Sequence, residues 1–542
     1  MIILKKKILV TCALPYSNGA IHLGHMLEHI QADIWVRYQR MIGNEVWFIC
    51  SDDAHGTAIM LKSHKNDISS KVFIASIFQD HINDLRNFNI SYDNYSSTHS
   101  IENLYLVNKC YYQLKLNNLI FLKKILQFYD TKKKMFLSDR FIQGTCPSCN
   151  ANNQYGDTCE VCGAVYKPIK LINPISNISN TKPIIRSSIH IFFNLSFFQE
   201  MLYKWIHSGV LPKEVVNKVK EWFTKDLKAW NISRDAPYFG FKIPDMKNKY
   251  FYVWLDATIA YISTFKNLCD KNCSISFNEF WNLNSKTELY HFIGKDIVYF
   301  HALFWPAILE SNQFRKPTKI FVHGHLKFRG MKFSKSKNVI ITAKKWLKYL
   351  DSDSLRYYFA SKLSSKVEDI EIDLKEFRNK INSDIVNKIV NLASRSSSFL
   401  NKYFDNLLSS QLENKKIYQY FVKQSDKISH FFNNRNFNFV IQTVVQLSDL
   451  ANQYFNKKAP WKMVDQKNNL KLQEICSMGI NLFRMIMIYL KPIVPDLAKK
   501  VELFLLTDLN WESIHAPLFN HYIAEFKSLY QRISIEKINQ LI

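Results

Sequence analysis

Two short groups of histidines and lysines, far apart in the chain, have the residue types and spacing for chemistry on phosphates. The segment His22–His25 reads His-Leu-Gly-His, and Lys332–Ser336 reads Lys-Phe-Ser-Lys-Ser. Imidazoles donate hydrogen bonds to phosphoryl oxygens as charge develops there. Lysines on a mobile loop can close over a triphosphate and stabilise the pentavalent state of in-line attack. Together the two segments predict one ATP site, built from both halves of a nucleotide-binding fold.

Each of these groups also has a plainer interpretation. Two histidines are common on the surface at a helix start, and a lysine-rich loop is often only solvated. Gly24 favours the ATP site, because a residue without a side chain lets a nucleotide ring approach the backbone. Among the lysines, we expect Lys335 to have the main role in the transition state.

Four clustered cysteines predict a metal site. They form two Cys-x-x-Cys pairs flanked by glycines: Cys146, Cys149, Cys159 and Cys162. Four thiolates fit a closed tetrahedral zinc site, and because no coordination position stays open, this zinc would be structural. A pair of disulfides is the alternative, which a reducing cytosol disfavours.

The segments around the histidines read as an α/β nucleotide-binding unit. Residues 8–14 are a continuous apolar run, typical of a central parallel strand, and residues 21–38 have helical periodicity. The histidines therefore open a helix at the carboxyl end of a strand, where α/β sheets bind ligands. Residues 46–50 form a second expected strand, followed by Asp52 and Asp53. Either carboxylate would hold an amino group or a ribose, or else cap a helix.

A second set of strands lies downstream. We expect strands at 249–255, 288–293 and 320–322 and a helix at 297–309. This alternation predicts the second half of a Rossmann-type doubly wound parallel sheet, split by the cysteine-bearing connective insertion. Five side chains here would wall an apolar pocket, although each alone is more typical of a core: Trp254, Tyr261, Phe300, His301 and Phe304.

The chain divides into five expected modules. The last of them has helical periodicity and would be an α-helical domain. The limits are 1–115 and 241–325 for the two halves of the nucleotide-binding fold, 116–240 for the insertion, 326–385 for the segment with the lysine loop, and 386–542 for the helical domain.

Composition bounds the class of protein. The 542 residues include 72 Lys and Arg against 46 Asp and Glu, a formal net charge of +26. Such a charge attracts a polyanion, and nucleic acid is the natural candidate. Lysine, asparagine and isoleucine are abundant throughout, however, so the codon bias of an AT-rich genome explains the charge equally well. No run approaches the about 18 apolar residues of a membrane span. The apolar run after Lys5–Lys7 ends at Pro15 without a cleavage site, so we expect a cytoplasmic protein.

Taken together, these features resemble the class I aminoacyl-tRNA synthetases, and among them the bacterial methionyl-tRNA synthetase family with a four-cysteine zinc knuckle. The similarity runs nearly end to end. Beyond the two signatures and the knuckle it rests on Cys12–Tyr16, Asp52–Gly56, Tyr252–Asp256, His291–Asp296, Asn391–Arg395 and Ala459–Trp461.

The resemblance implies a two-step reaction. The carboxylate of L-methionine attacks the α-phosphate of ATP, which gives methionyl-adenylate and pyrophosphate. The terminal ribose hydroxyl of elongator or initiator tRNA(Met) then takes the methionyl group. The resemblance further implies one structural zinc per chain, magnesium with ATP, and no membrane partner.

The resemblance also assigns residues to roles. The phosphates would be held by His22, His25, Lys332 and Lys335. ATP would also be contacted by Gly24, Gly294 and Asp296. The methionine amino group would be held by Asp53 and the backbone near Leu14. The methionine side chain would be enclosed by Tyr16, Trp254, Tyr261, Phe300, His301 and Phe304. The α-helical domain 386–542 would bind the anticodon, and the segment 326–385 would contact the tRNA stem. The CAU anticodon would be read by Asn391, Arg395 and Trp461, through hydrogen bonds and stacking.

Three positions depart from the family pattern. Phe333 stands where methionine is usual, which predicts activity with altered loop closure. Thr258 and Ala260 stand where Pro and Gly are usual, beside the methionine pocket, and would loosen substrate discrimination. The chain also ends without the appended domain that dimerises many relatives, so we expect a monomer.

Two rival functions remain open at this point. A class I synthetase for leucine or valine would need a larger editing insertion, and a cysteinyl enzyme would need an open zinc site with a histidine. A non-catalytic RNA-binding relative would explain the charge and Phe333, but it has no physical need for His22, His25, Asp53 and Lys335.

Overall fold

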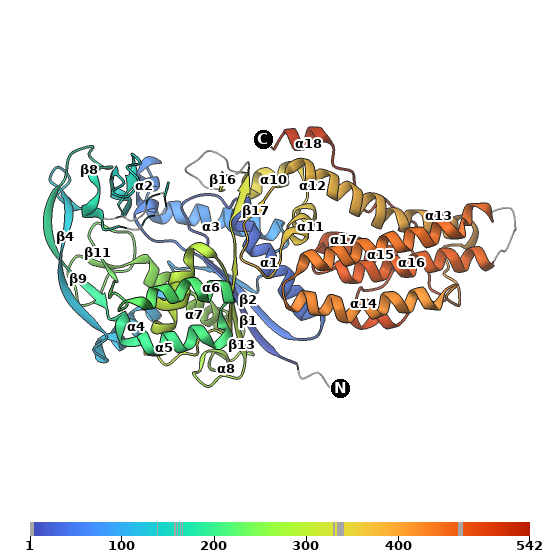
Figure 1. Ribbon diagram of the computed structural model, residues 1–542, viewed down its shortest axis with the longest axis horizontal. Coiled ribbons are helices and arrows are strands. Elements are labelled where there is room, and N and C mark those ends of the chain that lie inside the picture. The colour runs from blue at the N-terminus through green and yellow to red at the C-terminus, as the bar shows by residue number, and fades with distance from the viewer. Residues whose placement is uncertain are drawn as a thin grey trace.

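The molecule is elongated, with a parallel sheet at its centre, a curved antiparallel sheet at one end and a helical bundle at the other (Figure 1). The computed structural model describes residues 5–137, 139–156, 159, 161–162, 164, 166–328, 331–332, 341–463 and 470–541. None of the helices in these residues is long and apolar enough to cross a membrane.

The central sheet is the predicted doubly wound one. Its five strands are all parallel, in the order β14-β13-β1-β2-β3. They are β1 (Lys7–Cys12), β2 (Glu45–Asp52), β3 (Asn94–Ser97), β13 (Glu288–Gly294) and β14 (Lys319–His323). Strand order reverses between β1 and β13, and this switch point opens a crevice at the carboxyl ends of the strands.

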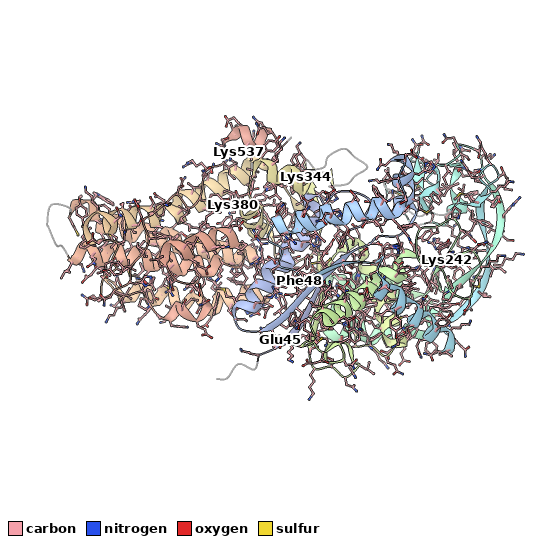
Figure 2. All side chains as sticks on the ribbon, turned by 180° about the vertical axis from the view of Figure 1, so that it is seen from behind. Glu45, Phe48, Lys242, Lys344, Lys380 and Lys537 are labelled. Carbon is pink, nitrogen blue, oxygen red and sulfur yellow. The ribbon has the colours of Figure 1, made fainter. Side chains whose placement is uncertain are left out.

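Helices cover both faces of this sheet, which explains why β1 is buried and largely apolar after Lys7. Ile8 and Val10 face a core shared with α1 (Leu23–Met41), and Leu9 faces a core shared with α7 (Val253–Lys271). On β2, Glu45 is exposed at the strand start, whereas Phe48 is buried within the molecule (Figure 2). The other α-helices in the part of the molecule around this sheet are α2 (Thr57–Lys65), α3 (Ser70–Asn87), α4 (Ile101–Leu116), α8 (Phe277–Trp281) and α9 (Trp305–Ser311).

The strand predicted over 249–255 was wrong in its second half. Only β12 (Lys249–Phe251) is extended, paired antiparallel with β11 (Ser233–Asp235), and α7 begins at Val253. The aromatic run favours a strand locally, but Leu255, Ile259 and Ile262 recur at helical spacing and are fully buried. Packing of that face therefore overrides local propensity, and it turns Trp254 onto a helix.

The connective insertion contains two small sheets. The larger is antiparallel, in the order β10-β9-β4-β5, with β4 (Ile120–Asp130), β5 (Met135–Phe136), β9 (Ile184–Phe193) and β10 (Trp230–Asn231). The smaller surrounds the cysteines, with β6 (Ile142–Thr145), β7 (Gln154–Tyr155) and β8 (Ile172–Ser176). The short helices α5 (Gln199–Trp205) and α6 (Lys213–Val219) follow.

A three-stranded sheet leads from the catalytic unit to the helices. It contains β15 (Leu326–Phe328), β16 (Met331–Lys332) and β17 (Ile370–Glu371), with α10 (Ala343–Tyr349) and α11 (Ser352–Lys362) between β16 and β17. The helical part contains α12 (Leu374–Lys380), a π-helical stretch Ile381–Val390, α13 (Asn391–Phe404), α14 (Lys415–Asn433), α15 (Phe437–Lys458), α16 (Leu470–Leu490) and α17 (Pro495–Leu505).

The C-terminal segment runs back from the bundle toward the catalytic unit. The Tyr530 hydroxyl donates to the Asp351 carboxylate at 2.8 Å, and α18 (Ile535–Asn539) packs on α12 (Figure 1). A buried ion pair also joins α11 to α1 of the central sheet unit. The Arg356 guanidinium of α11 lies 2.7 Å from the Asp33 carboxylate of α1, and both side chains are fully buried.

Candidate active site

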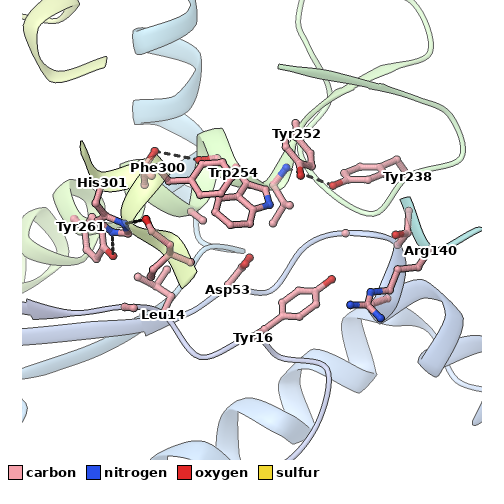
Figure 3. Close-up of a pocket in the computed structure, with 18 residues that line it drawn as sticks. Leu14, Tyr16, Asp53, Arg140, Tyr238, Tyr252, Trp254, Tyr261, Phe300 and His301 are labelled. Atoms are coloured by element: carbon pink, nitrogen blue, oxygen red, sulfur yellow. Dashed lines mark hydrogen bonds between the residues drawn. The ribbon is translucent and has the colours of Figure 1, made fainter. Parts of the chain in front are cut away.

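A cavity of about 340 Å³ opens at the switch point of the sheet (Figure 3). Loops that follow β1 and β2, the first turns of α7, and the side chains of Ile297, Phe300 and His301 form most of its wall. Its lining residues are Ala13, Leu14, Tyr16, Asp53, Gly56, Thr57, Ala58, Arg140, Tyr238, Tyr252, Val253, Trp254, Ala257, Thr258, Tyr261, Ile297, Phe300 and His301.

Backbone hydrogen bonds bring the loops after β1 and β2 together. The Asp53 N–H donates to the Pro15 carbonyl at 2.9 Å, and the Ser17 N–H donates to the Asp53 carbonyl at 2.8 Å. Gly56 has a φ of +111°, and a Cβ there would lie 2.8 Å from the Tyr16 hydroxyl oxygen. Only glycine fits this turn without displacing Tyr16, so Tyr16 and Asp53 are held at the same end of the cavity.

The two aspartates after β2 differ in their surroundings. Asp52 is fully buried and accepts hydrogen bonds from His81 at 2.7 Å, from Ser17 at 3.0 Å and from the Tyr95 hydroxyl. Asp53 faces the cavity, and its Oδ1 has no hydrogen-bond partner among the described residues. Burial, followed by the charges of Asp256 and Asp52, raises the pKa of Asp53 well above its usual value. Neither aspartate caps a helix, so Asp53 is the carboxylate placed to receive a cationic group.

The other end of the cavity is aromatic and uncharged. The Tyr261 hydroxyl lies 2.8 Å from Nε2 of His301, and His301 Nδ1 lies 3.0 Å from the Ile297 carbonyl oxygen. Nδ1 must therefore carry the proton, and Nε2 accepts from Tyr261. Burial lowers the pKa of His301 to about 4, so the imidazole is neutral at pH 7. Such a compartment suits an apolar, polarizable side chain.

The cavity wall contains most of the side chains predicted for it. Leu14, Tyr16, Asp53, Trp254, Tyr261, Phe300 and His301 all line it. Phe304 is not among the lining residues, because it packs in the core against Phe193 and Trp230, with ring centroids 5.7 and 4.9 Å away. Thr258 lines the cavity and donates to the Leu255 carbonyl at 3.0 Å, whereas Ala260 is buried outside it.

The two histidines of the first signature form the cap of α1. The Gly24 N–H donates to His22 Nδ1 at 3.1 Å, and the His22 N–H donates to His25 Nδ1 at 3.2 Å. Their rings stack with centroids 3.7 Å apart. Both imidazoles thus lie at the N-terminus of a 19-residue helix, where the helix dipole favours anions.

The lysine signature falls mostly outside the described residues. Lys332 ends β16, its side chain is not described, and Phe333 and Lys335 lie in the undescribed segment 333–340. The chain beyond this segment is anchored beside the histidines, since the Leu23 N–H donates to the Ile341 carbonyl at 3.1 Å.

Gly294 and Asp296 lie at the carboxyl end of β13. Asp296 Oδ1 lies 2.6 Å from His325 Nε2, and Gly294 faces the His323 ring, which a Cβ would approach to 3.7 Å. The Glu28 carboxylate of α1 accepts from the Ala13 N–H at 2.6 Å and lies 3.1 Å from His323 Nε2. These contacts join the carboxyl ends of β1, β13 and β14 around the crevice.

The four cysteines converge as predicted. Their Sγ atoms all lie within 4.8 Å of one another, with 3.9 Å between Cys146 and Cys162 and 3.6 Å between Cys149 and Cys159. A tetrahedron of thiolates about 2.3 Å from a metal has sulfur atoms about 3.8 Å apart. Backbone N–H groups of Ser148 and Cys162 also point at the sulfurs of Cys146 and Cys159, each at 3.4 Å. The donor set fits one closed metal site.

The three residues predicted for the anticodon lie on the helical bundle. Asn391 and Arg395 are one turn apart on α13, and the Arg395 guanidinium lies 5.3 Å from the Trp461 ring centroid. Trp461 is 45% exposed, which leaves its ring available for stacking.

Sequence reasoning missed the cavity residues that come from the insertion. Arg140, whose guanidinium lies 4.5 Å from the Tyr155 ring centroid, and Tyr238 enter the wall from segments without a recognisable pattern. Their position depends on how the insertion folds back over the crevice, and no local signal in the sequence reports it.

Comparison with known proteins agrees with this geometry. The family model described as tRNA synthetases class I (M) matches residues 8–397. The chain is 61% identical to a methionine–tRNA ligase of Buchnera aphidicola subsp. Schizaphis graminum, over 99% of this chain and 98% of that protein. It is 58% identical to the methionine–tRNA ligase of Wigglesworthia glossinidia brevipalpis, over 99% and 98%. The Mycobacterium tuberculosis methionyl-tRNA synthetase in complex with methionyl-adenylate has the same fold, with a TM-score of 0.80 at 21% identity over 97% of this chain and 100% of that one.

Proposed function

This chain belongs to the class I methionyl-tRNA synthetases, and on that premise we propose that the cavity beside Asp53 is where it activates methionine. As a methionine–tRNA ligase, it attaches L-methionine to tRNA(Met) through a methionyl-adenylate. Both elongator and initiator tRNAs are its expected substrates.

One observation carries the assignment of methionine to this cavity. The Asp53 carboxylate, which has an unpartnered oxygen, lines the cavity, and the uncharged pair Tyr261–His301 lies at its aromatic end (Figure 3). Methionine has a matching polarity, with an ammonium group at one end and a thioether at the other. The neutral imidazole of His301 keeps charge away from the thioether, which excludes substrates with a charged side chain.

The phosphates of ATP belong at the N-terminus of α1 in this proposal. His22 and His25 would donate hydrogen bonds to the phosphoryl oxygens, and Lys332 and Lys335 would approach from the lysine loop. The methionine carboxylate oxygen attacks the α-phosphorus, the bond to the bridging oxygen breaks, and pyrophosphate leaves as its magnesium complex. Gly24, Gly294 and Asp296 would contact ATP from the crevice between β1 and β13.

The second step transfers methionine to the terminal ribose of tRNA. The ribose hydroxyl attacks the carbonyl carbon of the adenylate, and AMP leaves. Asn391, Arg395 and Trp461 would read the anticodon on the helical bundle, far along the molecule from the cavity (Figure 1). The stacked guanidinium and indole offer planar surfaces to unpaired bases.

The four-cysteine site would hold one zinc ion with a structural role. Its sulfur geometry supports tetrahedral coordination without an open position. When bound, the zinc holds the turns of the knuckle together and supplies no chemistry to the cavity. The cytoplasm is the proposed compartment, because tRNA charging needs ATP and newly made tRNA. The monomeric state also remains a prediction. The module limits near residues 115, 240, 325 and 385 remain predictions, which limited proteolysis would test.

Amino-acid-dependent exchange of pyrophosphate into ATP tests the proposal. Exchange is measured with magnesium and, in parallel, with methionine, leucine, valine, isoleucine and cysteine. Methionine alone should support it, and Lys335→Ala should abolish it. Equal exchange with leucine or cysteine, or none from folded and zinc-loaded protein, would contradict the assignment.

A further inference from the structure

A second buried carboxylate lies behind the cavity, and the reaction as described does not use it. Asp256, in the first turn of α7, is fully buried. Its Oδ2 lies 2.6 Å from His55 Nδ1, and its Oδ1 has no hydrogen-bond partner among the described residues. Its chain neighbour Ala257 lines the cavity, so Asp256 lies directly behind the wall.

Asp256 lies close enough to Asp53 to act on it electrostatically. Each has a buried oxygen without a partner, and the charge of Asp256 adds to burial in raising the pKa of Asp53. Burial likewise raises the pKa of Asp256 well above its usual value. Two neighbouring buried carboxylates cannot both ionise cheaply when no cation lies between them. When no methionine occupies the cavity, this pair of carboxyl groups therefore tends to retain a proton.

A line of hydrogen bonds leads from the pair toward the surface. His55 Nδ1 contacts Asp256 at 2.6 Å, and His55 Nε2 contacts His99 Nδ1 at 2.9 Å. His55 is fully buried, whereas His99 is partly exposed. Burial lowers the pKa of His55 to about 3 and that of His99 to about 4, so both rings are neutral at pH 7. Each neutral ring has one donor and one acceptor, as a proton relay requires.

We propose that the pair Asp53 and Asp256 retains one proton in the free enzyme, held on Asp256, and that the ammonium group of methionine expels it through His55 and His99. This proposal rests on the assignment of methionine to the cavity. Asp256 then acts as a positioning residue, whose charge appears only when the substrate cation arrives to balance it.

A proton can pass from Asp256 through His55 and His99 to water without either imidazole gaining a net charge. Before binding, Asp256 is protonated on Oδ2 and donates to His55 Nδ1, while each imidazole carries its proton on Nε2. During release, Oδ2 gives its proton to His55 Nδ1, and His55 Nε2 gives its proton to His99 Nδ1. His99 loses its Nε2 proton to water. Both rings end as neutral Nδ1 tautomers, and His55 now donates to an ionised Asp256.

The neighbouring titratable groups leave this path intact. Asp52 is held by His81, Ser17 and Tyr95 and lies outside the line. Lys71 is the charged group that acts on His99, and it lowers the pKa of that ring after burial and His55. The tyrosines and the arginine at the cavity are Tyr16, Tyr238, Tyr252, Tyr261 and Arg140.

Titration calorimetry in two buffers of different ionisation enthalpy tests the retained proton. The probes are L-methionine, the unreactive methioninol, which keeps the ammonium group, and 4-methylthiobutanoate, which lacks it. At pH 7 the first two should release close to one proton per molecule bound, and the third none. The dissociation constant of methioninol should rise by up to tenfold per unit fall in pH. Binding of methionine without proton release would overturn the proposal.

Asp256→Asn isolates the role of Asp256, because the amide can still donate to His55 but does not titrate. Proton release should fall to less than half of the wild-type value. The matched control is Asp270→Asn at the exposed end of the same helix, where release should stay unchanged. Unchanged release in Asp256→Asn would count against the pair. If that variant does not fold, the wild-type calorimetry with its three probes decides alone.

His99→Gln tests the exit path. With a pH indicator in stopped flow, this variant should release the same number of protons at a rate at least tenfold slower. The control His207→Gln changes an exposed histidine of the insertion and should leave the rate unchanged. A wild-type rate in His99→Gln would exclude the relay. Pyrophosphate exchange distinguishes a failure of the relay from a failure of the methionine assignment. An enzyme that is active with methionine but releases no proton would refute only the relay.

Discussion

The hydroxyl of Tyr261 lies 2.8 Å from Nε2 of His301, and both side chains are buried at the apolar end of the cavity. The Ile297 carbonyl oxygen fixes the tautomer of His301, so Tyr261 is the donor of this bond. The aromatic compartment thus contains two cavity-lining side chains that hydrogen-bond to each other.

Removal of the Tyr261 hydroxyl should weaken methionine binding. Tyr261→Phe leaves a buried acceptor on His301 without its donor, a loss of about 1 to 3 kcal/mol. We expect kcat/KM for methionine in pyrophosphate exchange to fall by about 5- to 150-fold. The KM for ATP should change little. Tyr299→Phe, at a tyrosine outside the cavity wall, is the control, and an equal loss there would contradict the assignment.

Acid should destabilise the protein partly through His29. This imidazole is buried beside the Tyr92 hydroxyl, and burial lowers its pKa to about 3. The unfolded chain protonates it below about pH 6.5, so the unfolded state binds more protons between pH 3 and 6.5. The free energy of unfolding should therefore decrease as the pH is lowered through this window. His29 alone should account for a decrease of about 2 kcal/mol between pH 7 and pH 5.

The difference between wild type and His29→Gln isolates this effect. Buried carboxyl groups such as Asp353, whose pKa burial raises to about 7, act in the opposite direction, and they are common to both proteins. Urea unfolding at pH 7.5 and pH 5 gives the two slopes. Parallel slopes for the two proteins would mean that His29 is not buried neutral.

Loss of the metal should disorder the knuckle and leave the helical bundle folded. Cys159→Ser removes one of four sulfur ligands, so bound zinc, measured colorimetrically, should fall from one per chain to near zero. Proteolysis should then cleave between residues 142 and 176. Methionine activation should also fall, because Arg140 in the cavity wall stacks on Tyr155 of the knuckle sheet. Cys273→Ser, at an exposed cysteine elsewhere, should retain zinc and activity.

Trp461 should act on tRNA and not on methionine activation. Its exposed ring lies beside Arg395, and a stacked base contributes about 1 to 3 kcal/mol. Trp461→Ala should raise the KM for tRNA(Met) by about 5- to 150-fold and leave pyrophosphate exchange unchanged. Tyr420→Ala, at an exposed aromatic residue of α14, should have neither effect. A fall in exchange would indicate misfolding in place of lost recognition.

Arg356 of α11 should help to hold the helical part on the catalytic part, because it contacts both Asp33 of α1 and the chain that follows α16. Arg356 also donates to the carbonyls of Ile493 and Pro492, at 2.8 and 3.1 Å. Arg356→Met leaves a buried carboxylate with fewer donors, which should cost about 3 kcal/mol. The shift of the urea midpoint measures it. Lys266→Met, at an exposed ion pair with Asp270, should cost less than about 0.5 kcal/mol.

Sequence alone predicts the central sheet because its strands are buried on both faces. The runs at 8–14, 46–50, 288–293 and 320–322 have no polar face, and each is a parallel strand in the structure. The same reasoning fails at 253–255, where aromatic and branched residues favour a strand but a buried helical face decides.

The sequence likewise predicts some residues of the candidate site and not others. Residues that sit in motifs at strand ends, such as Asp53 and the cysteines, were found by spacing. Arg140 and Tyr238 were not, because the insertion brings them to the cavity by tertiary packing. Phe304 was predicted to line the cavity together with its aromatic neighbours, but it lies at the end of the π-helical turn Phe300–Phe304 and packs in the core against Phe193.

The order of strands in the central sheet also has a consequence during synthesis on the ribosome. β1 pairs with β2 on one side and with β13 on the other, and β13 begins at Glu288. Translation at about 5 to 20 residues per second delivers β13 about 15 to 55 s after β1. During that interval one edge of β1 and an apolar strand face stay uncovered. The insertion, whose β4 and β9 pair with each other, can fold first. We therefore expect the nascent N-terminal half to expose an unpaired strand edge until β13 is made, and chaperones shield edges of this kind.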